Sequence, residues 1–405
     1  MLENSPGTTY FCRLIIFGSF YMENTLVEKT NILKGKPKWV KWLAIVVLVY
    51  LLLVAVGVIS RGFNLATAEH AKVLFDFASN PVIALIIGIV ATASIQSSST
   101  VTSIIVGMVA GGMPMAIAIP MVMGANIGTS LTSTIVSLGH IQNRDEFRRA
   151  FSAATVHDCF NLLAVLIILP IELLFKPLET LAGHFAAYFR SGASVDIAVF
   201  NPIDASLQPL VGLITTVFSF LPDIVDGVFM IIFGIAMILF VIKEMGRILK
   251  KLMVGRSLEL MQKTVGRGPI SGIFAGGMIT VMVQSSSTTT ALIVPMAGNG
   301  VFSIKQVYPF TLGGNIGTTI TALVASMAFT GPMAVLAFQI AMVHFFFNLF
   351  GILLIYSLPF LRNLPVMVSE KLAEISLRNR FFVMGYILGV FFAAPLVIIG
   401  IARYF

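Results

Sequence analysis

The sequence predicts an all-α polytopic membrane protein with two inverted repeats, each containing a re-entrant helical hairpin and a discontinuous transmembrane helix. Three observations predict this fold. Of the 405 residues, 57% are hydrophobic and only 11% are charged, less than half of the roughly 25% typical of soluble domains. Apolar runs follow one another along the chain, and polar motifs inside them recur in the same order. The composition excludes a disordered chain and a nucleic-acid-binding protein, and it argues against a water-soluble globule.

The first segment, 1–41, is expected to be a cytoplasmic tail. It lacks the cleavage site typical of a signal peptide, and Met22 is an alternative start. Four lysines precede the apolar run Trp42–Ile59, which is long enough to span about 30 Å of hydrocarbon. By the positive-inside rule, the N-terminus then lies in the cytoplasm. The formal net charge of +8 is explained by membrane orientation rather than by an acidic partner.

Three polar landmarks recur later in the chain at distances of 187 to 189 residues. Such repeats fix the architecture of many transporters. The matching pairs are the Gln-Ser-Ser-Ser-Thr runs 96–100 and 284–288, the Asn-Ile-Gly-Thr motifs 126–129 and 315–318, the His-x-x-x-Asn pairs 157–161 and 344–348, and Pro81 and Gly88 with Pro269 and Gly276.

Loop charges indicate that the two repeats have opposite orientations. The segment 60–80, before the first repeat, has two basic and two acidic residues, whereas 243–267, before the second, has seven basic residues. Basic loops that alternate in this way fit a two-fold axis in the membrane plane. The apolar runs beside residues 97 and 286 are each about 15 residues long, too short to cross alone, and therefore suggest re-entrant hairpins.

These patterns divide the chain into six segments. They are the cytoplasmic tail (1–41), the first transmembrane helix and outer loop (42–80), repeat 1 (81–175), a connecting loop, transmembrane helix and basic cytoplasmic loop (176–268), repeat 2 (269–362), and a C-terminal loop and transmembrane helix (363–405).

The two serine-rich runs are candidates for an anion site. If the repeats are inverted, both hairpin tips reach the midplane from opposite sides. The free N–H groups of each outgoing half-helix carry partial positive charge, which suits an anion. Serine hydroxyls can donate to its oxygens. The alternative is that these serines only cap a helix break, but this does not explain why the run appears twice. The hydroxyls concerned belong to Ser97, Ser98, Ser99, Ser285, Ser286 and Ser287.

The Gly-x-Asn-x-Gly-Thr motifs are candidates for a cation site. Two glycines permit unwound backbone, which frees carbonyl oxygens. Together with Asn126, Thr129, Asn315 and Thr318, these oxygens suit an alkali cation better than a soft metal. The alternative is close helix packing at the glycines, which does not by itself require the asparagines and threonines.

Charged side chains are missing where an anion would bind. Residues 81–143 contain no Asp, Glu, Lys or Arg, and 269–361 contain only Lys305. Helix dipoles supply up to ~2 kcal/mol each when partly buried, whereas an unpaired buried ion costs several kcal/mol. Co-bound cations would offset this cost. Binding of the anion and the cation would then be mutually dependent, which is the physical basis of coupled transport.

Asp158 is the exception, because it lies inside the apolar run 150–170. An intramembrane carboxylate is a functional-site hypothesis by default. Thr155 and Asn161 lie one turn away on either side and join it as candidate ligands of the cation, as does Asn348, the counterpart of Asn161. The alternative is a carboxylate paired with His157 or capping a break. No third ligand or nucleophile has a spacing suited to zinc or hydrolysis.

These motifs resemble the type II sodium-dependent inorganic phosphate cotransporters. The resemblance covers nearly all of 60–362 and rests on the paired Gln-Ser-Ser-Ser runs, Gly-Ala-Asn-Ile-Gly-Thr, Ala-Thr-Val-His-Asp-Cys-Phe-Asn and His-Phe-Phe-Phe-Asn. It implies a multi-pass sodium/phosphate symporter of the cell (inner) membrane. Phosphate ligands would lie in the hairpins, at Gln96, Ser97, Ser98, Ser99, Thr100, Gln284, Ser285, Ser286, Ser287 and Thr288.

The resemblance also implies an electrogenic cycle. Electroneutral members have Gly where this chain has Asp158, although Ser152 replaces the family's usual Ala. The short segment 171–207 lacks the cysteine-containing outer loop of the animal members, which resembles a prokaryotic member. Ligands and partners would be phosphate, sodium and lipid, with no cofactor and no nucleic acid. Alternatives are a sodium-coupled carboxylate or other oxyanion transporter, a passive anion channel, and a membrane enzyme, for which no catalytic constellation is present.

Overall fold

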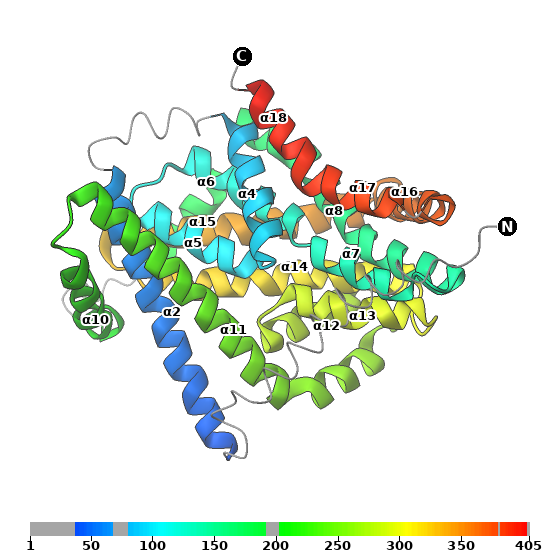
Figure 1. Cartoon of the computed structure of the whole chain (residues 1–405), viewed down its shortest axis with the longest axis horizontal. Coiled ribbons are helices and arrows are strands. Elements are labelled where there is room, and N and C mark those ends of the chain that lie inside the picture. Colours follow the sequence, from blue (N-terminus) through cyan, green and yellow to red (C-terminus); the bar gives the residue numbers. More distant parts are fainter. Residues whose placement is uncertain (1–36, 68–79, 192–201, 380, 403–405) are drawn as a thin grey trace. The chain divides into compact units, whose positions relative to one another are not determined.

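The computed structural model describes residues 37–67, 80–191, 202–379 and 381–402, and within them the chain is helical without strands (Figure 1). Most of the expected cytoplasmic tail and the outer loop 68–79 lie outside the described residues. The first helix is α2 (Lys38–Thr67). The chain divides into a unit that ends at Val47 and a larger unit that begins at Leu48. The larger unit contains both repeats and is described below.

The two repeats have the same order of helices. In repeat 1 they are α4 (Pro81–Ile95), α5 (Ser98–Ala110), α6 (Met115–Gly128), α7 (Leu131–Ser137), the 3₁₀ turn η1 (Leu138–His140) and α8 (Arg144–Phe175), with α9 (Pro177–Ser191) following. In repeat 2 they are α12 (Pro269–Val283), α13 (Ser286–Gly298), α14 (Ile304–Ser326), α15 (Gly331–Gly351) and the π segment η2 (Ile352–Tyr356), with α16 (Pro359–Arg378) following.

Further helices lie between and after the repeats. They are α10 (Pro202–Phe218) and α11 (Asp223–Thr264) between them, and α17 (Phe381–Leu388), the π segment η3 (Gly389–Ala393) and α18 (Ala394–Ala402) at the end.

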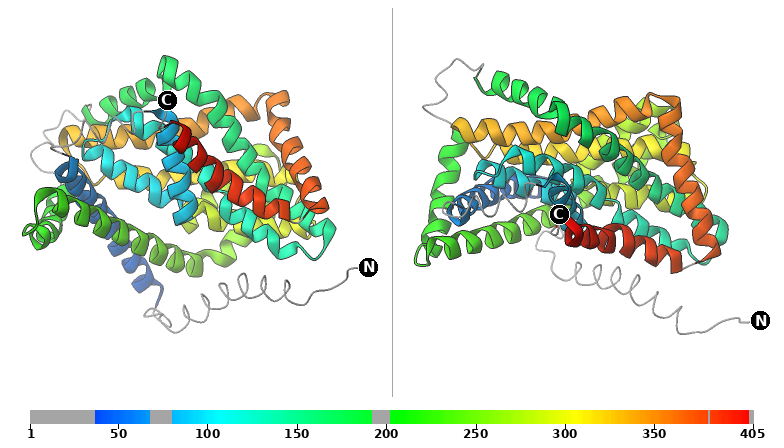
Figure 2. Two further views of the ribbon diagram at one scale, coloured as in Figure 1. Left: turned by 45° about the horizontal axis from the view of Figure 1, so that its top comes forward. Right: turned by 90° about the horizontal axis from the view of Figure 1, so that it is seen from above.

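The repeats pack by exchanging equivalent helices. In each repeat the first hairpin helix packs on its own third helix, α4 on α6 and α12 on α14. The second hairpin helix packs on its own third helix and also on the other repeat, α5 on α14 and α15, and α13 on α7 and α8. The trailing helices follow the same rule, with α9 on α15 and α16 on α8. Figure 2 shows the yellow and orange helices of repeat 2 beside the cyan and green helices of repeat 1.

Paired glycines allow α4 and α6 to approach at backbone distance. A Cβ atom added to Gly88 would overlap the carbonyl oxygen of Met121, and one added to Gly124 would overlap that of Leu85. The same relation holds in repeat 2, where Gly276 meets Phe310 and Gly313 meets Ile273. The first glycine of each Gly-x-Asn-x-Gly-Thr motif therefore serves close helix packing, as the alternative interpretation expects.

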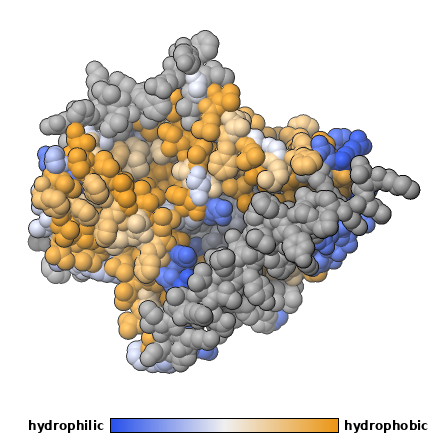
Figure 3. Space-filling model, viewed as in Figure 1, coloured by the Kyte–Doolittle hydropathy of each residue, from blue (hydrophilic) through white to orange (hydrophobic). Residues whose placement is uncertain are grey.

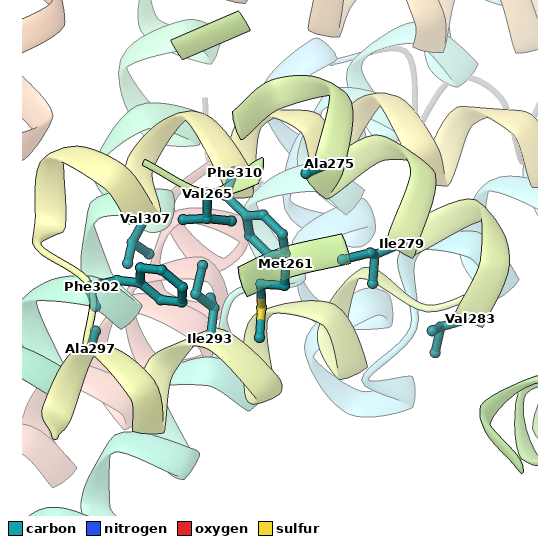
Figure 4. Close-up of a cluster of buried hydrophobic side chains, with 11 residues drawn as sticks. Met261, Val265, Ala275, Ile279, Val283, Ile293, Ala297, Phe302, Val307 and Phe310 are labelled. Atoms are coloured by element: carbon teal, nitrogen blue, oxygen red, sulfur yellow. The ribbon is translucent and has the colours of Figure 1, made fainter. Parts of the chain in front are cut away.

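A cluster of buried apolar side chains lies among α12, α13 and α14 (Figure 4). Met261 and Val265 reach it from the end of α11, and Ala153 reaches it from α8 of the other repeat. Burial of such side chains stabilises the hairpin against the helix that follows it in the chain.

The discontinuous helix is present in repeat 1 only. Helix α6 ends at Gly128 and α7 begins at Leu131, directly after the asparagine motif. The hydroxyls of Ser133 and Thr134 donate to the carbonyl oxygen of Ser130, at 2.8 and 3.2 Å, which competes with helical backbone bonding. In repeat 2 the expectation is wrong, because α14 continues unbroken through its motif.

Two segments expected to be loops are helical. The basic segment 243–267 continues α11 as far as Thr264, and 363–378 belongs to α16. Both are rich in Leu, Met, Lys, Arg and Glu, which favour helix. In α16 the buried residues recur at helical spacing, from Val366 to Ser369, Ala373 and Ser376, and the helix packs on α8.

The described surface is rich in exposed apolar side chains, as the orange areas of Figure 3 show. Examples are Phe220, Ile270, Phe274 and Phe360, each more than half exposed. Six of the described helices are long and apolar enough to cross a membrane. Large apolar patches facing outward are what a lipid environment requires, and the chain is a multi-pass helical membrane protein.

The glycine contacts predict a strong packing effect. Gly124→Ala and Gly313→Ala place a methyl group against a carbonyl oxygen, so each should lower the free energy of unfolding by about 1–3 kcal/mol or more. Thermal unfolding in detergent measures this change. The control is Gly212→Ala, where a Cβ has open space. Equal Tm values for all three variants would contradict the close packing.

Candidate functional site

The tip of the first hairpin has an unusual backbone. Gln96 ends α4 in the left-handed conformation, with φ 57°, and Ser97 precedes α5 in an extended one. The Ser97 side chain accepts a hydrogen bond from the amide of Thr100 at 3.3 Å, which makes it the N-cap of α5. Only these two residues therefore separate α4 from α5.

The second tip repeats this geometry almost angle for angle. Gln284 has φ 56°, and Ser285 caps α13 by accepting from the amide of Thr288 at 3.1 Å. Among the described residues other than glycine, only Gln96, Gln284 and Lys176 have positive φ. Left-handed glutamines are costly, and such outliers concentrate at functional sites.

The two tips meet. The hydroxyl of Ser287, in the first turn of α13, donates to the carbonyl oxygen of Gln96 at 3.3 Å. On the second tip, the Gln284 side chain also accepts from the hydroxyl of Thr321 on α14, at 2.9 Å. Two runs that lie 188 residues apart in the chain are thus brought into contact by the exchanged packing of the repeats.

The predicted serines have different roles at these tips. Ser97 and Ser285 are caps, as the capping alternative expects. Ser98, Ser99 and Ser286 are buried, and their hydroxyls form no hydrogen bond with the residues that the structure describes. Thr100 donates to Ser97 at 2.8 Å. Capping therefore explains one serine of each run and leaves the hydroxyls of Ser98, Ser99 and Ser286 for another partner.

Asn315 joins repeat 2 to repeat 1 through its side-chain amide. Its oxygen lies 2.7 Å from Nε2 of His157, and its nitrogen donates to the side-chain oxygen of Asn161 at 2.8 Å. Because the amide oxygen can only accept, His157 donates through Nε2. Asn161 in turn donates to the carbonyl oxygen of Asn126 at 2.9 Å. All four residues are buried.

Asn126 makes the equivalent contacts from repeat 1 to repeat 2. Its oxygen lies 3.2 Å from Nε2 of His344, and its nitrogen donates to the side-chain oxygen of Asn348 at 2.7 Å. The asparagine of each Gly-x-Asn-x-Gly-Thr motif is therefore hydrogen-bonded to the His-x-x-x-Asn pair of the other repeat. We call these two sets of side chains the cross-repeat networks.

Asp158 lies outside these networks. Its Oδ2 accepts from the hydroxyl of Tyr386 at 2.9 Å and lies 3.4 Å from that of Thr134, whose one proton is shared with the carbonyl oxygen of Ser130. The other oxygen, Oδ1, is buried and has no hydrogen-bond partner among the described residues. The expected alternative pairing with His157 is not observed, because His157 faces Asn315. A buried carboxylate oxygen without a donor is suited to a cation.

The three predicted threonine ligands bond locally. Thr129, Thr155 and Thr318 each donate to the carbonyl oxygen four residues earlier, at 2.8 to 3.0 Å. Their oxygen lone pairs remain able to accept or to coordinate.

Four residues of the cross-repeat networks and of the surroundings of Asp158 were not predicted as site residues from the sequence. His157 and His344 share the repeat register, which is a signal that they have equivalent roles. Tyr386 stands in the apolar segment Phe381–Leu388, where a buried hydroxyl needs a partner. Thr134 gives no sequence signal of its own.

Comparisons with known proteins identify the family. The Na+/Pi-cotransporter family model matches residues 51–185 and 237–361. Sodium-dependent phosphate transport protein 2A of Rattus norvegicus is 36% identical over 422 residues, which cover 87% of this chain and 66% of that protein. Protein 2B of Homo sapiens is 32% identical over 445 residues, covering 87% and 64%. No solved structure gives a significant match.

The chain thus spans a little under two thirds of the length of these relatives. The matched residues contain both hairpins, both asparagine motifs and Asp158. On this evidence the chain belongs to the Na+/Pi-cotransporter family.

Proposed function

We propose that this protein is a secondary active symporter that imports inorganic phosphate together with sodium ions. The observation that carries the proposal is the contact between the two hairpin tips at Ser287 and Gln96. It brings two helix N-termini and unpartnered serine hydroxyls to one place, as an oxyanion site requires. The relatives' names supply the substrates, sodium and phosphate. A cotransporter family also fits the prediction that the chain is not an enzyme.

Phosphate would bind between the tips, at residues 96–100 and 284–288. The amides of Ser98 and Ser99 in α5 and of Ser286 and Ser287 in α13 have no intrahelical partner. The hydroxyls of Ser98, Ser99 and Ser286 are uncommitted among the described residues. These groups can donate to phosphate oxygens. None of them carries a full positive charge.

Sodium would supply the positive charge. Lys305, which is the one basic residue of 269–361, is exposed at the start of α14, and is no partner for a buried anion. Asp158 Oδ1 is the strongest candidate ligand, because burial without a donor penalises it until a cation arrives. Thr155, Thr129, Thr318 and the network asparagines remain proposed sodium ligands.

Charge counting favours an electrogenic cycle. Moving one charge through 100 mV is worth about 2.3 kcal/mol, so importing divalent phosphate against an inside-negative potential costs about 4.6 kcal/mol. Two sodium ions cancel this charge, and a third makes the cycle net positive inward. Asp158, which repeat 2 replaces with Phe345, is the proposed ligand of the third ion.

The exchanged packing supports alternating access by two inverted repeats. We propose that the hairpins are re-entrant, that the repeats move against each other around the tips, and that the protein lies in the cell (inner) membrane with a cytoplasmic N-terminus. The prokaryotic origin stays a prediction from the sequence.

Uptake into proteoliposomes tests the function. Phosphate uptake should require sodium on the outside, should be faster at an inside-negative potential, and should be inhibited by arsenate but not by succinate. Inhibition by succinate alone would favour the carboxylate transporter, and phosphate flux without sodium would favour a channel.

The hairpin site predicts the effect of removing one hydroxyl. Ser98→Ala and Ser286→Ala should each raise the phosphate concentration for half-maximal uptake about tenfold or more, because each removes a hydrogen bond to a charged oxyanion. Ser376→Ala, at a buried serine of α16 that bonds to Leu372, is the control. Wild-type half-saturation in both tip variants would place the phosphate site elsewhere.

Asp158 predicts the charge moved per phosphate. In Asp158→Gly this ratio, from parallel current and tracer measurements, should fall from about one to zero, while neutral uptake continues. Asp226→Gly is the matched control, because Asp226 is also a buried carboxylate with an unpartnered oxygen. The charge moved per phosphate should not change in this variant. Undiminished charge per phosphate in Asp158→Gly would exclude the assigned role.

The cross-repeat networks predict that breaking one of their hydrogen bonds lowers the stability of the protein even when no sodium is present. Asn315→Ala leaves His157 and Asn161 buried without these partners, at about 1–3 kcal/mol for each unpaired group. Its Tm in sodium-free detergent should fall below that of wild type and of Asn299→Ala, an exposed position at the end of α13. A Tm deficit that appears only with sodium present would instead make Asn315 a sodium ligand alone.

A further inference from the structure

The two oxygens of Asp158 have unequal surroundings. Oδ2 receives both donors, and the Tyr386 bond of 2.9 Å is shorter than the Thr134 bond of 3.4 Å. Oδ1 receives none from the described residues. The hydroxyl of Tyr386 therefore holds one oxygen and leaves the other uncommitted, which fixes how the carboxylate plane is turned.

The ring of Tyr386 is itself held on several sides. Its centroid lies 6.2 Å from that of Phe151 and 6.4 Å from that of Phe391, both edge-on, and 6.5 Å from that of Phe382. The π segment η3 begins three residues later, at Gly389, and such segments are frequent at functional sites. A packed aromatic ring gives its hydroxyl a fixed position.

Tyr386 belongs to neither repeat. It lies beyond the last residue matched by the family model, 361, and its helix follows α16 as in Figure 1. The same C-terminal segment continues through η3 into α18, and both pack against α4, the first helix of hairpin 1. The segment thus contacts the buried carboxylate at one point and the hairpin at another.

We propose that Tyr386 is a positioning residue for sodium: it holds Asp158 so that Oδ1 is presented to the ion. The inference rests on the proposed function for the identity of the ion. It assigns the C-terminal segment a role in sodium coupling that repeat 2 does not duplicate, because Phe345 stands at the position that matches Asp158.

Removal of the hydroxyl should weaken sodium binding and leave phosphate binding unchanged. Without the Tyr386 donor the carboxylate can turn, and sodium must order it on binding. Loss of one hydrogen bond corresponds to about a three- to tenfold higher sodium concentration for half-maximal uptake. Thr134→Val removes the longer bond and should give a smaller increase.

The experiment compares Tyr386→Phe with Tyr356→Phe. Both substitutions keep the ring, and the Tyr356 hydroxyl has no hydrogen bond with the described residues. Half-saturation by sodium is measured at saturating phosphate, and half-saturation by phosphate at saturating sodium. Independently, the rise of Tm with added sodium, against choline and without phosphate, is measured for wild type, both tyrosine variants and Asp158→Asn.

The expected result is a three- to tenfold shift of both sodium readouts in Tyr386→Phe only, with phosphate half-saturation unchanged and a sodium-induced rise of Tm that is smaller in Asp158→Asn than in wild type. Sodium readouts equal to wild type, or a loss of maximal rate alone, would overturn the inference while the proposed function stands. Sodium stabilisation that depends on Asp158 and Tyr386 in a protein that takes up no phosphate would overturn the function and leave the inference standing. Absence of sodium stabilisation in wild type would overturn the inference.

Discussion

The absence of basic side chains from the centre of both repeats is the constraint on which the rest of the structure depends. Buried polar groups in an apolar helical protein must find partners inside it. Here the available partners are amides, hydroxyls and helix ends, because residues 81–143 contain no charged residue and 269–361 contain only the exposed Lys305. Such groups can orient an oxyanion but cannot neutralise it. In the proposed function, the positive charge comes from ions that bind with it.

The exchange of helices between the repeats satisfies this constraint with few residues. Each asparagine of a glycine motif is bonded by the His-x-x-x-Asn pair of the other repeat, so neither repeat can bury its polar groups alone. The same exchange brings Ser287 to Gln96. Within each repeat, the glycines let the first hairpin helix approach the helix after the hairpin at backbone distance.

Much of this arrangement could be predicted because the motifs occur twice. The hairpins, with their turns at Gln96 and Gln284, follow from the paired serine runs between short apolar segments, and the family follows from the same motifs. The partners of single residues could not be predicted. His157 bonds Asn315 rather than Asp158. This partner depends on which neighbouring helix packs against each face of α8, and the spacing of residues along α8 does not determine that packing. The unbroken α14 likewise depends on the side chains that follow its motif, where nothing matches the hydroxyls of Ser133 and Thr134 in repeat 1.

Equilibrium binding of radiolabelled phosphate to the purified protein in detergent tests the central claim most directly, because it requires no transport and no membrane potential. The account predicts saturable binding in sodium chloride, no measurable binding when choline replaces sodium, and unchanged sodium-supported binding in Lys305→Met. Phosphate binding of equal affinity in choline, or its loss in Lys305→Met, would contradict the claim that sodium supplies the missing charge.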